Sequence, residues 1–347
     1  PQLQYQYDDF IAWQNEMLAG EKGDKLSRFW ANELAGDLPR LDLVADYHPS
    51  KQAFKKSSVQ IKIEPKLTQE LRQLSLQEGG SIYSILLAAF QVLLYKYSDQ
   101  PDILIGTPVH GRSKLRFSKL VGLFSNIVPM RGQIDPLESF RSHLRKTSKY
   151  VKQVLLHQHY PSAMLPELMQ SRGEPTGQSL IQAGFNLLRP PRRINDLVAI
   201  SLDNTHKQPM PFGGMLISCL EIDLDYGIGH ADLFLNLFDI GDRLAGTINY
   251  NAGMFKEETI SSMADHFYQL LDEIVTHPDD TVANLKILLP EERQTILFSW
   301  NETAVPLPPN QFMHTLFEEQ TTRTPQATVV VCGERELTYD ELNCGAN

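Results

Sequence analysis

Apolar side chains recur every three to four residues in several stretches of the chain, and this spacing predicts α-helices. Two helices are expected within residues 7–35, separated where Gly20 and Gly23 interrupt the pattern. The segment 82–97 is apolar almost all round, so a helix there would be buried in the middle of the protein. Further helices are expected over residues 66–78, 137–157, 257–277, 290–294 and 312–320.

Shorter runs rich in branched and aromatic residues predict β-strands. The run 59–63 alternates apolar and polar positions, as a half-buried strand does. Other runs predict strands at 103–105, 121–124, 184–188, 216–225, 230–239, 244–250 and 327–332, and a strand followed by a helix at 336–343. Because helices and strands alternate along the chain, the pattern favours the α/β class.

Two of the predicted strands are followed by Gly, Pro and polar residues. Gly106-Thr107-Pro108 follows the run 103–105, and Ser125-Asn126 follows the run 121–124. If these strands are neighbours, their ends lie close together, and polar side chains there tend to face a cleft. The residues expected at such a cleft are Thr107, His110, Arg112, Ser125 and Asn126. The alternative is that they form ordinary turns after two strands.

Composition narrows the function classes only coarsely. With 347 residues, 42% hydrophobic and 21% charged, the chain can form two or three domains or one large two-lobed domain. The net charge of −10 argues against a nucleic-acid partner, which would need a clustered basic surface. The basic run 112–119 is interpreted as a solvated loop, with contact to an anionic partner as the alternative.

Cysteine usage and hydropathy bear on the compartment. Cys219, Cys332 and Cys344 show no metal-binding or disulfide spacing, which favours reduced thiols. No apolar run approaches the roughly 20 residues that a membrane span needs, so no membrane partner is expected. We therefore expect a cytoplasmic protein. Because the first residue is Pro1 and not Met, we also expect the chain to be a piece of a longer protein.

Three stretches of the sequence together carry a family resemblance. Residues 106–131 contain GTPVHGR and VGLFSNIVPMR, residues 7–14 read YDDFIAWQ, and residues 157–161 read HQHYP. These stretches resemble motifs of the condensation domain of nonribosomal peptide synthetases, and they occur along the chain in the same order as in that family. Residues 7–14 are similar to its motif YxDYAxWQ and residues 157–161 to its motif HQDYP. The resemblance implies a fold like that of chloramphenicol acetyltransferase and the CoA-dependent acyltransferases, with a mixed sheet flanked by helices. In that family two lobes enclose a tunnel where carrier-protein-bound thioesters are joined by an amide bond.

The family's catalytic signature, HHxxxDG, is absent from these residues. Its second His positions or deprotonates the attacking amine, and no His-His pair occurs in the 347 residues. No catalytic residue is therefore assigned, and we expect the N-terminal lobe with this motif to precede Pro1. Because a positioned base contributes typically 10²–10⁴-fold to such a reaction, we expect the polypeptide alone to make no peptide bond.

The resemblance also suggests individual site residues. Substrate contact is expected of Thr107, His110, Asn126 and Asp232, the last in a segment similar to the family's QFDL. Turn chemistry at Asn126 and a loop cap at Asp232 are the alternatives, and His110 stands where the family commonly has Ala. His159 replaces the Asp of HQDYP and could carry charge near neutral pH. Structural motif positions are Tyr7, Asp9, Trp13, Gln14, Gly122, Arg131 (as a salt bridge), Gln158, Tyr160 and Pro161. No metal ligands are expected.

The C-terminal residues resemble a second domain. The segment 300–309 is rich in Pro, and Leu337–Leu342 (LTYDEL) is similar to the first motif of adenylation domains, LTYxEL. We therefore expect residues 1–295 to be the C-terminal portion of a condensation domain, 296–310 a linker, and 311–347 the start of an adenylation (AMP-binding) domain.

The resemblance implies partners rather than bound cofactors. Upstream and downstream peptidyl carrier proteins would present substrates on phosphopantetheine arms, and the adenylation domain in cis and the N-terminal lobe would be further partners. ATP and Mg²⁺ would be needed only by the adenylation domain beyond this chain. Two alternatives stay open: a non-catalytic docking platform for carrier proteins, and a relative that cyclises, epimerises or forms esters. A stand-alone acyltransferase is disfavoured by the adenylation-like tail.

Overall fold

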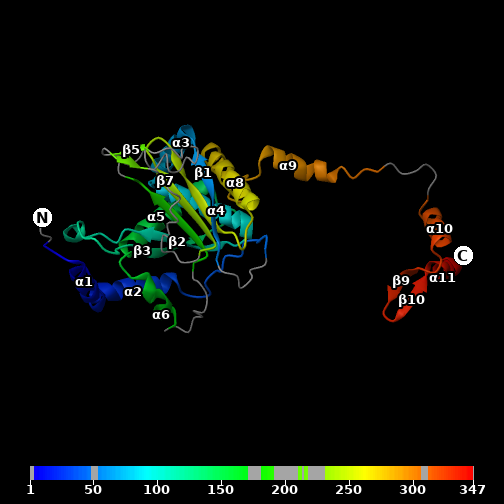
Figure 1. The fold of residues 1–347 in the computed structure, drawn as a ribbon, viewed down its shortest axis with the longest axis horizontal. Helices are drawn as coiled ribbons and strands as arrows, with labels where there is room; N and C mark the ends of the chain where they lie inside the picture. Colours follow the sequence, from blue (N-terminus) through cyan, green and yellow to red (C-terminus); the bar gives the residue numbers. More distant parts are fainter. Residues whose placement is uncertain are drawn as a thin grey trace. The chain divides into compact units, whose positions relative to one another are not determined.

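A six-stranded mixed β-sheet forms the centre of the larger of two compact units, residues Pro1–Leu289 and Pro290–Asn347 (Figure 1). The computed structural model describes residues 4–47, 54–170, 181–190, 210–212, 215–217, 231–305 and 312–346. The strand order is β1-β8-β7-β4-β2-β3. The bounds are β1 (Lys56–Ile63), β2 (Asp102–Val109), β3 (Asn126–Gln133), β4 (Ala183–Leu188), β7 (Leu233–Asp239) and β8 (Leu244–Asn251). Strands β2, β4 and β7 are parallel, and the other neighbours are antiparallel.

Two helices of the first unit begin at a serine N-cap. Ser81 and Ser139 are the N-caps of two helices, and their side chains accept the backbone N–H groups of Ser84 and Ser142. Gly20 separates the first two helices. The bounds are α1 (Tyr7–Ala19), α2 (Glu21–Glu33), α3 (Pro65–Gln77), α4 (Ile82–Ser98), α5 (Phe140–Leu156), α6 (Leu165–Gln170) and α8 (Glu257–Thr276), with single 3₁₀ turns η1 (Leu115–Phe117) and η2 (Ser162–Met164).

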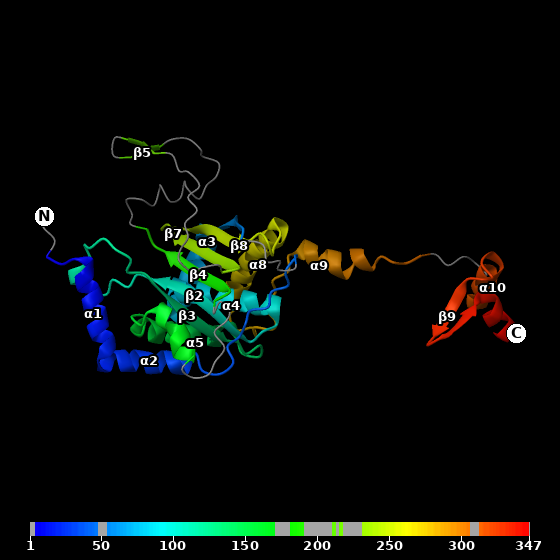
Figure 2. The same cartoon turned by 60° about the horizontal axis from the view of Figure 1, so that its bottom comes forward.

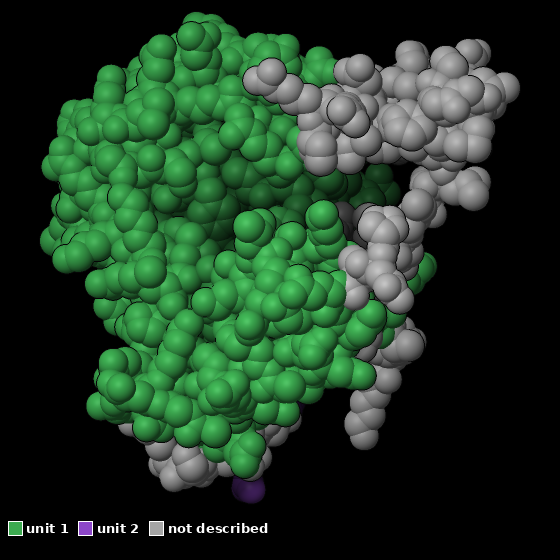
Figure 3. Space-filling model, turned by 90° about the vertical axis from the view of Figure 1, so that its left-hand side faces the viewer, with its two compact units in different colours: residues 1–289 green, residues 290–347 purple. Residues whose placement is uncertain are grey.

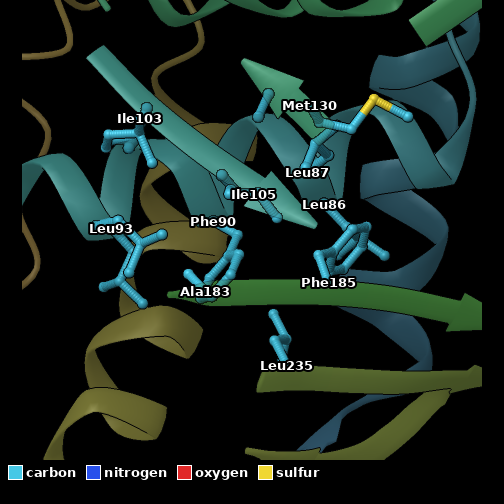
Figure 4. Packing of buried hydrophobic residues seen from close by; sticks show 14 of the residues in the cluster. Leu86, Leu87, Phe90, Leu93, Ile103, Ile105, Met130, Ala183, Phe185 and Leu235 are labelled. Carbon is cyan, nitrogen blue, oxygen red and sulfur yellow. The ribbon is translucent and has the colours of Figure 1, made fainter. Parts of the chain in front are cut away.

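Helix α4 is the central element of the hydrophobic core. Every residue from Ser84 to Leu94 is buried, as the nearly continuous apolar sequence predicts. Figure 4 shows Phe90 of α4 beside Phe185 of β4, with Ile105 of β2 close by. Helices α3, α5 and α8 pack against α4 (Figure 2). Burial of this helix layer against the sheet is the main source of stability, because buried apolar area contributes roughly 25 cal/mol per Å².

The second unit is small and consists of short elements. Its bounds are α9 (Pro290–Leu297), η4 (Ser299–Asn301), α10 (Met313–Arg323), β9 (Thr328–Cys332), β10 (Arg335–Thr338) and α11 (Tyr339–Ala346). Strands β9 and β10 pair antiparallel. Helix α11 starts with reciprocal capping, since Thr338 Oγ1 accepts the N–H of Glu341 and the Glu341 carboxylate accepts the N–H of Thr338. A separate two-stranded pair, β5 (Met210–Phe212) and β6 (Met215–Ile217), belongs to the first unit.

The expected fold class, a mixed sheet flanked by helices, is confirmed, and the predicted helices agree with the structure to within a few residues. The strand predicted at 121–124 is wrong, because Val121 and Leu123 are 92% and 74% exposed. The expected end of the preceding strand at Gly106 is also wrong. Strand β2 continues to Val109, and Pro108 is tolerated because β4 pairs with β2 only at Ile105 and Gly106. Most of the run predicted at 216–225 lies outside the described residues.

The length and hydropathy of the described helices bear on membrane insertion. None of them is by itself long and apolar enough to cross a membrane. Helices α3 and α4 satisfy these criteria only as a pair, with a bend of 101° between them.

Candidate functional site

The loop between β2 and β3 is held by an aromatic cluster on α1. Phe10 of α1 is buried with Phe117 and Phe124 of the loop, and Trp13 packs against them. The Tyr7 hydroxyl donates a hydrogen bond of 2.5 Å to the carbonyl of Leu123. Positions 7, 10 and 13 share one helix face, so the spacing within YDDFIAWQ explains the cluster. The aromatic cluster consists of the buried residues Phe10, Phe117, Leu120 and Phe124, with Tyr5, Tyr7 and Trp13 packed against them.

Two glycines of the loop are required by close contacts. Gly111 has a φ of +63°, and a Cβ at this position would lie 1.8 Å from the Phe124 carbonyl oxygen. A Cβ at Gly122 would lie 2.3 Å from the ring of Tyr7. Arg112, next to the first glycine, places its guanidinium 3.9 Å from the centroid of the Phe124 ring and donates to two loop carbonyls. The glycines and Arg112 therefore determine the shape of this loop.

Asn126 joins two of the motifs found in the sequence. Its Nδ2 donates to the carbonyls of Gln158 and Tyr160, at 2.9 and 2.7 Å, and its Oδ1 accepts the N–H of Ser162 at 2.9 Å. The segment 158–162 follows α5, and Asn126 is the first residue of β3. The Asn126 side chain thus holds the backbone of residues 158–162, which follow α5, against the start of β3.

Thr107 lies inside the protein on the helix side of the sheet. It is 3% exposed, accepts a hydrogen bond from the Tyr83 hydroxyl at 2.9 Å and donates one to the carbonyl of Phe185 at 3.1 Å. Burial raises the pKa of Tyr83 and outweighs the opposite effect of its hydrogen bond to Thr107. The polar groups of Thr107 and Asn126 are thus used within the protein. Substrate contact by either side chain stays a prediction.

The other two predicted substrate contacts lie elsewhere. His110 is exposed in the loop after β2. Asp232 precedes β7, with Oδ1 accepting from Asn251 Nδ2 at 3.3 Å. The strand register places Asp232 level with Leu104 of β2. It places Asn126 beside Val109 at the other end of β2. At roughly 3.3 Å per residue and 4.8 Å per strand, Asp232 is about 17 Å along and about 14 Å across the sheet from Asn126. The structure does not bring the predicted residues into one site.

The Asp232 carboxyl group gives a prediction for pH dependence. Its pKa is raised by burial, which outweighs the hydrogen bond from Asn251 and the charge of Arg40. Because the folded-state pKa is above the unfolded value, the protonated form is favoured by folding, and this stabilisation is lost as the pH rises through the folded-state pKa. We expect Asp232→Asn to raise the free energy of unfolding at pH 7 by less than about 1 kcal/mol, since the carboxyl is partly exposed.

Urea unfolding of both proteins between pH 3 and pH 8 tests this expectation. The difference in the free energy of unfolding between Asp232→Asn and wild type should grow with pH and vanish in acid, because asparagine does not titrate. Asp242→Asn, at an exposed carboxylate in the turn after β7, is the matched control and should show no such growth. A difference for Asp232→Asn that is the same at every pH would contradict the assigned cause.

The remaining motif positions have structural roles in the described residues. The salt bridge expected of Arg131 is present, with Nη2 2.6 Å from Asp102 Oδ2, and its Nη1 donates to the carbonyls of Glu33 and Ala35 at the end of α2. Asp9 accepts the N–H of Gln6 at 2.7 Å and so caps α1. The other positions are Gln14, half-buried in α1, Gln158, whose Nε2 donates to the carbonyl of Leu155, buried Tyr160, and Pro161, the N-cap of η2.

The expectation that His159 carries charge near neutral pH needs correction. Its pKa is lowered, first by burial and then by the positive charges of Lys22 and Lys114. The ring lies edge-on to Trp13, with 6.0 Å between the ring centroids. A neutral imidazole in this place is consistent with the packing of α1 against the loop.

Sequence reasoning missed a row of polar residues across the sheet. Gln60, Thr247, Asn236 and Asn186 occupy paired positions on β1, β8, β7 and β4. Because neighbouring residues on a strand point to opposite faces, this row lies on the face away from Phe185 and Leu235, which pack with α4. Asn186 Nδ2 donates to Asn236 Oδ1 at 3.0 Å. A single Asn within each of the apolar runs GFNLL and LFLNL was the available signal.

The surface of the first unit is hollowed on one side. Figure 3, viewed from the side where α1 lies in Figure 1, shows a deep cleft in this unit. Within the described ranges, no group of three His, Cys, Asp or Glu side chains could hold a metal ion.

Comparisons with known proteins agree in pointing to one family. A family model described as "Condensation domain" matches residues 1–297. Gramicidin S synthase 2 from Brevibacillus brevis is 31% identical over 350 residues, which is 100% of this chain and 8% of that protein. Tyrocidine synthase 3 from Brevibacillus parabrevis is 31% identical over 346 residues, covering 99% of this chain and 5% of that protein. The chain thus spans a small part of these curated relatives.

A solved structure supports the fold independently. The crystal structure of a four-domain nonribosomal peptide synthetase bound to AMP and glycine aligns with a TM-score of 0.72 at 21% identity. The alignment covers 93% of this chain and 24% of that one. At this identity the likeness shows the fold.

Proposed function

Because the chain belongs to the condensation-domain family, we propose that it is part of a nonribosomal peptide synthetase module. There it would join carrier-protein-bound aminoacyl and peptidyl thioesters by amide-bond formation. The observation that carries this proposal is the family match over residues 1–297. The contacts within Tyr7–Gln14, the loop 110–125 and the segment 158–162 add support, because they show what the family-like motifs do in this fold.

The proposed reaction needs orientation and one proton transfer. The amine nitrogen of the acceptor attacks the thioester carbonyl carbon of the donor, the C–N bond forms and the C–S bond breaks. The proton lost by the amine ends on the departing thiol, so the products are an amide and a free thiol. Holding both substrates in reactive geometry removes much of the entropic barrier. The chain contains no His-His pair, so we propose that the base is supplied by an N-terminal lobe with HHxxxDG.

Roles of individual residues follow from their contacts. We propose that Asn126 and Arg112 are positioning residues, since their polar groups hold the 158–162 segment and the loop 110–125. The polar row that includes Asn186 and Asn236 is a further candidate for substrate contact, because it lies on the sheet face away from the helix layer, although these two side chains are 5% and 2% exposed and bonded to each other. The substrates would arrive on the phosphopantetheine arms of upstream and downstream carrier proteins. Thr107, His110 and Asp232 stay predictions as substrate contacts.

We propose further that residues 311–347 begin an adenylation domain. The support is the motif LTYDEL at Leu337–Leu342, whose Thr338 and Glu341 cap α11 reciprocally. Residues 1–295 would then be the C-terminal portion of the condensation domain and 296–310 the linker. The division into compact units falls at Leu289 and Pro290, so α9 is grouped with the second unit.

A single-turnover assay with two loaded carrier proteins tests the proposal. We expect no amide product above the uncatalysed background with this chain alone, and product when a lobe bearing HHxxxDG is supplied as a second polypeptide. Product from the chain alone would contradict the need for that lobe. Carrier-protein binding without product in the presence of the lobe would favour the docking platform. An ester, cyclised or epimerised product would identify one of the related activities.

A further inference from the structure

We propose that a polar cavity between α2, α4, α5 and the edge strand β3 is a second binding site, which takes a small neutral molecule bearing an amide group. The cavity has a volume of about 510 Å³. Sites for small molecules typically have volumes of about 300–1,000 Å³, whereas one water molecule occupies about 30 Å³. The proposal does not depend on the amide-forming activity described above.

Two buried side chains of the cavity wall lack partners. Gln91 of α4 is 0% exposed and His143 of α5 is 2% exposed, and both line the cavity. Within the part of the chain that the structure describes, Gln91 Nε2 and His143 Nε2 make no hydrogen bond, while His143 Nδ1 faces the Glu138 carboxylate. A buried donor or acceptor without a partner costs about 1–3 kcal/mol. Their presence beside a cavity is explained if a ligand completes the hydrogen bonds.

The backbone leaves room for these groups. A Cβ at Gly132 of β3 would lie 2.5 Å from Gln91 Nε2, so glycine at this position leaves room for the Gln91 amide. The other end of the Gln91 amide is occupied, because Thr147 Oγ1 donates to Oε1 at 3.4 Å. The N–H groups of Gln91 are therefore the part of the amide that is left for a ligand.

The two basic side chains at the cavity are already paired. Arg131 binds Asp102, and Lys146 Nζ lies 2.6 Å from Glu138 Oε2. The Tyr150 hydroxyl accepts the backbone N–H of Arg131 at 3.2 Å. An anionic ligand would have to separate one of the two ion pairs, which favours a neutral ligand.

The chemistry of His143 selects an amide among neutral ligands. Its Nδ1 lies 3.6 Å from Glu138 Oε1. Burial raises the pKa of Glu138, but hydrogen bonds from His143, Lys146 and Ser142 outweigh burial and hold the pKa at about 2. Because Nδ1 faces the Glu138 carboxylate, Nε2 is the ring nitrogen that is left for a ligand. An amide offers a C=O to the Gln91 N–H, and it carries both a donor and an acceptor that can pair with His143 Nε2.

The cavity lies far from the contacts of Asn126. Gly132 is six positions along β3 from Asn126, about 20 Å at roughly 3.3 Å per residue. Gly132, Gln91 and His143 lie on the helix side of the sheet, opposite to the polar row with Asn186 and Asn236. A ligand in the cavity therefore leaves that face free.

Titration of the whole chain with N-acetylalanine N′-methylamide, followed by NMR, tests the proposal. We expect saturable shifts of the Gln91 side-chain amide and the His143 ring. Gln91→Met keeps the side-chain volume but removes the donor, so the affinity should fall by about tenfold. The same variant, without ligand, should melt at the wild-type temperature or above it, because an unpartnered buried donor has been removed.

Two controls make the outcomes unambiguous. Gln73→Met makes the same change at an exposed position of α3 and should leave the affinity unchanged. Ethylene glycol, which carries hydroxyl groups only, should bind more weakly than the amide. The proposal is overturned if the amide does not bind, if glycol binds equally well, or if Gln91→Met binds the amide like wild type. A lowered melting temperature of Gln91→Met together with an unchanged affinity for the amide would mean that Gln91 bonds a structural water and not the ligand.

Discussion

Replacing Asn126 with alanine is expected to lower the free energy of unfolding of the first unit by about 3 kcal/mol, because three hydrogen bonds of about 1 kcal/mol each are lost. The carbonyls of Gln158 and Tyr160 and the N–H of Ser162 lose their partner. Urea unfolding measures the total loss in the free energy of unfolding. Hydrogen exchange at the Ser162 amide measures the local effect, which should be faster in the variant under native conditions.

Asn126→Asp is the matched comparison, since it keeps the size and the Oδ1 acceptor. Its second oxygen would face the two carbonyl oxygens that the Nδ2 group contacts. We expect a loss at least as large as for alanine at pH 7, and partial recovery below pH 4, where the carboxyl is protonated and can donate. Unchanged unfolding and exchange in Asn126→Ala would show that Asn126 does not hold the segment 158–162.

The helices could be predicted because the sequence signals that specify them lie within the helices themselves and at their ends. Helix α4 combines an uninterrupted apolar run with an N-cap at Ser81, and both signals lie within the same stretch of sequence. Strand β1 alternates, and its alternation agrees with burial of Ile61 and Ile63. Local pattern and tertiary packing agree in these elements, so periodicity was sufficient to find them.

The run 121–124 shows where periodicity fails. Its apolar residues suggested a strand, but Phe124 is buried by α1, more than 100 positions away in the sequence, and not by a neighbouring strand. Val121 and Leu123 are exposed. An apolar run that packs against a distant helix and one that pairs in a sheet look the same in a single sequence, so only the three-dimensional contacts separate them.

The candidate site residues were selected by residue type, and the sequence does not show which way their side chains point. Thr107 and Asn126 stood out as polar residues near strand ends, but the register turns both toward the helix layer. A shift of one residue in the pairing of two strands would turn every side chain of the shifted strand to the other face, and the sequence alone does not fix this register. Conversely, Asn186 and Asn236 were unremarkable within apolar strands, and only the pairing of β4 with β7 places them side by side.

Trp30 connects α2 to the end of α5, next to the segment 158–162 that Asn126 holds, and its removal is expected to have the largest effect on stability. The side chain is 1% exposed, and Nε1 donates to the carbonyl of His157 at 3.1 Å. Beside it, the ring of Phe29 stacks on that of His157, with 3.8 Å between centroids. Trp30→Ala should lower the free energy of unfolding by about 3–5 kcal/mol, since it leaves a large cavity in the core.

Trp30→Phe separates the two contributions of this side chain. It keeps most of the ring volume and removes the N–H, so the His157 carbonyl loses its donor and the expected loss is smaller than for alanine, about 1–2 kcal/mol. Urea unfolding of the three proteins gives both differences, and hydrogen exchange at the Ser162 amide reports on the adjoining segment. Trp30 and Asn126 hold neighbouring residues, so the double variant should lose less stability than the two single variants together. Strict additivity would mean that the end of α5 and the segment 158–162 are held independently.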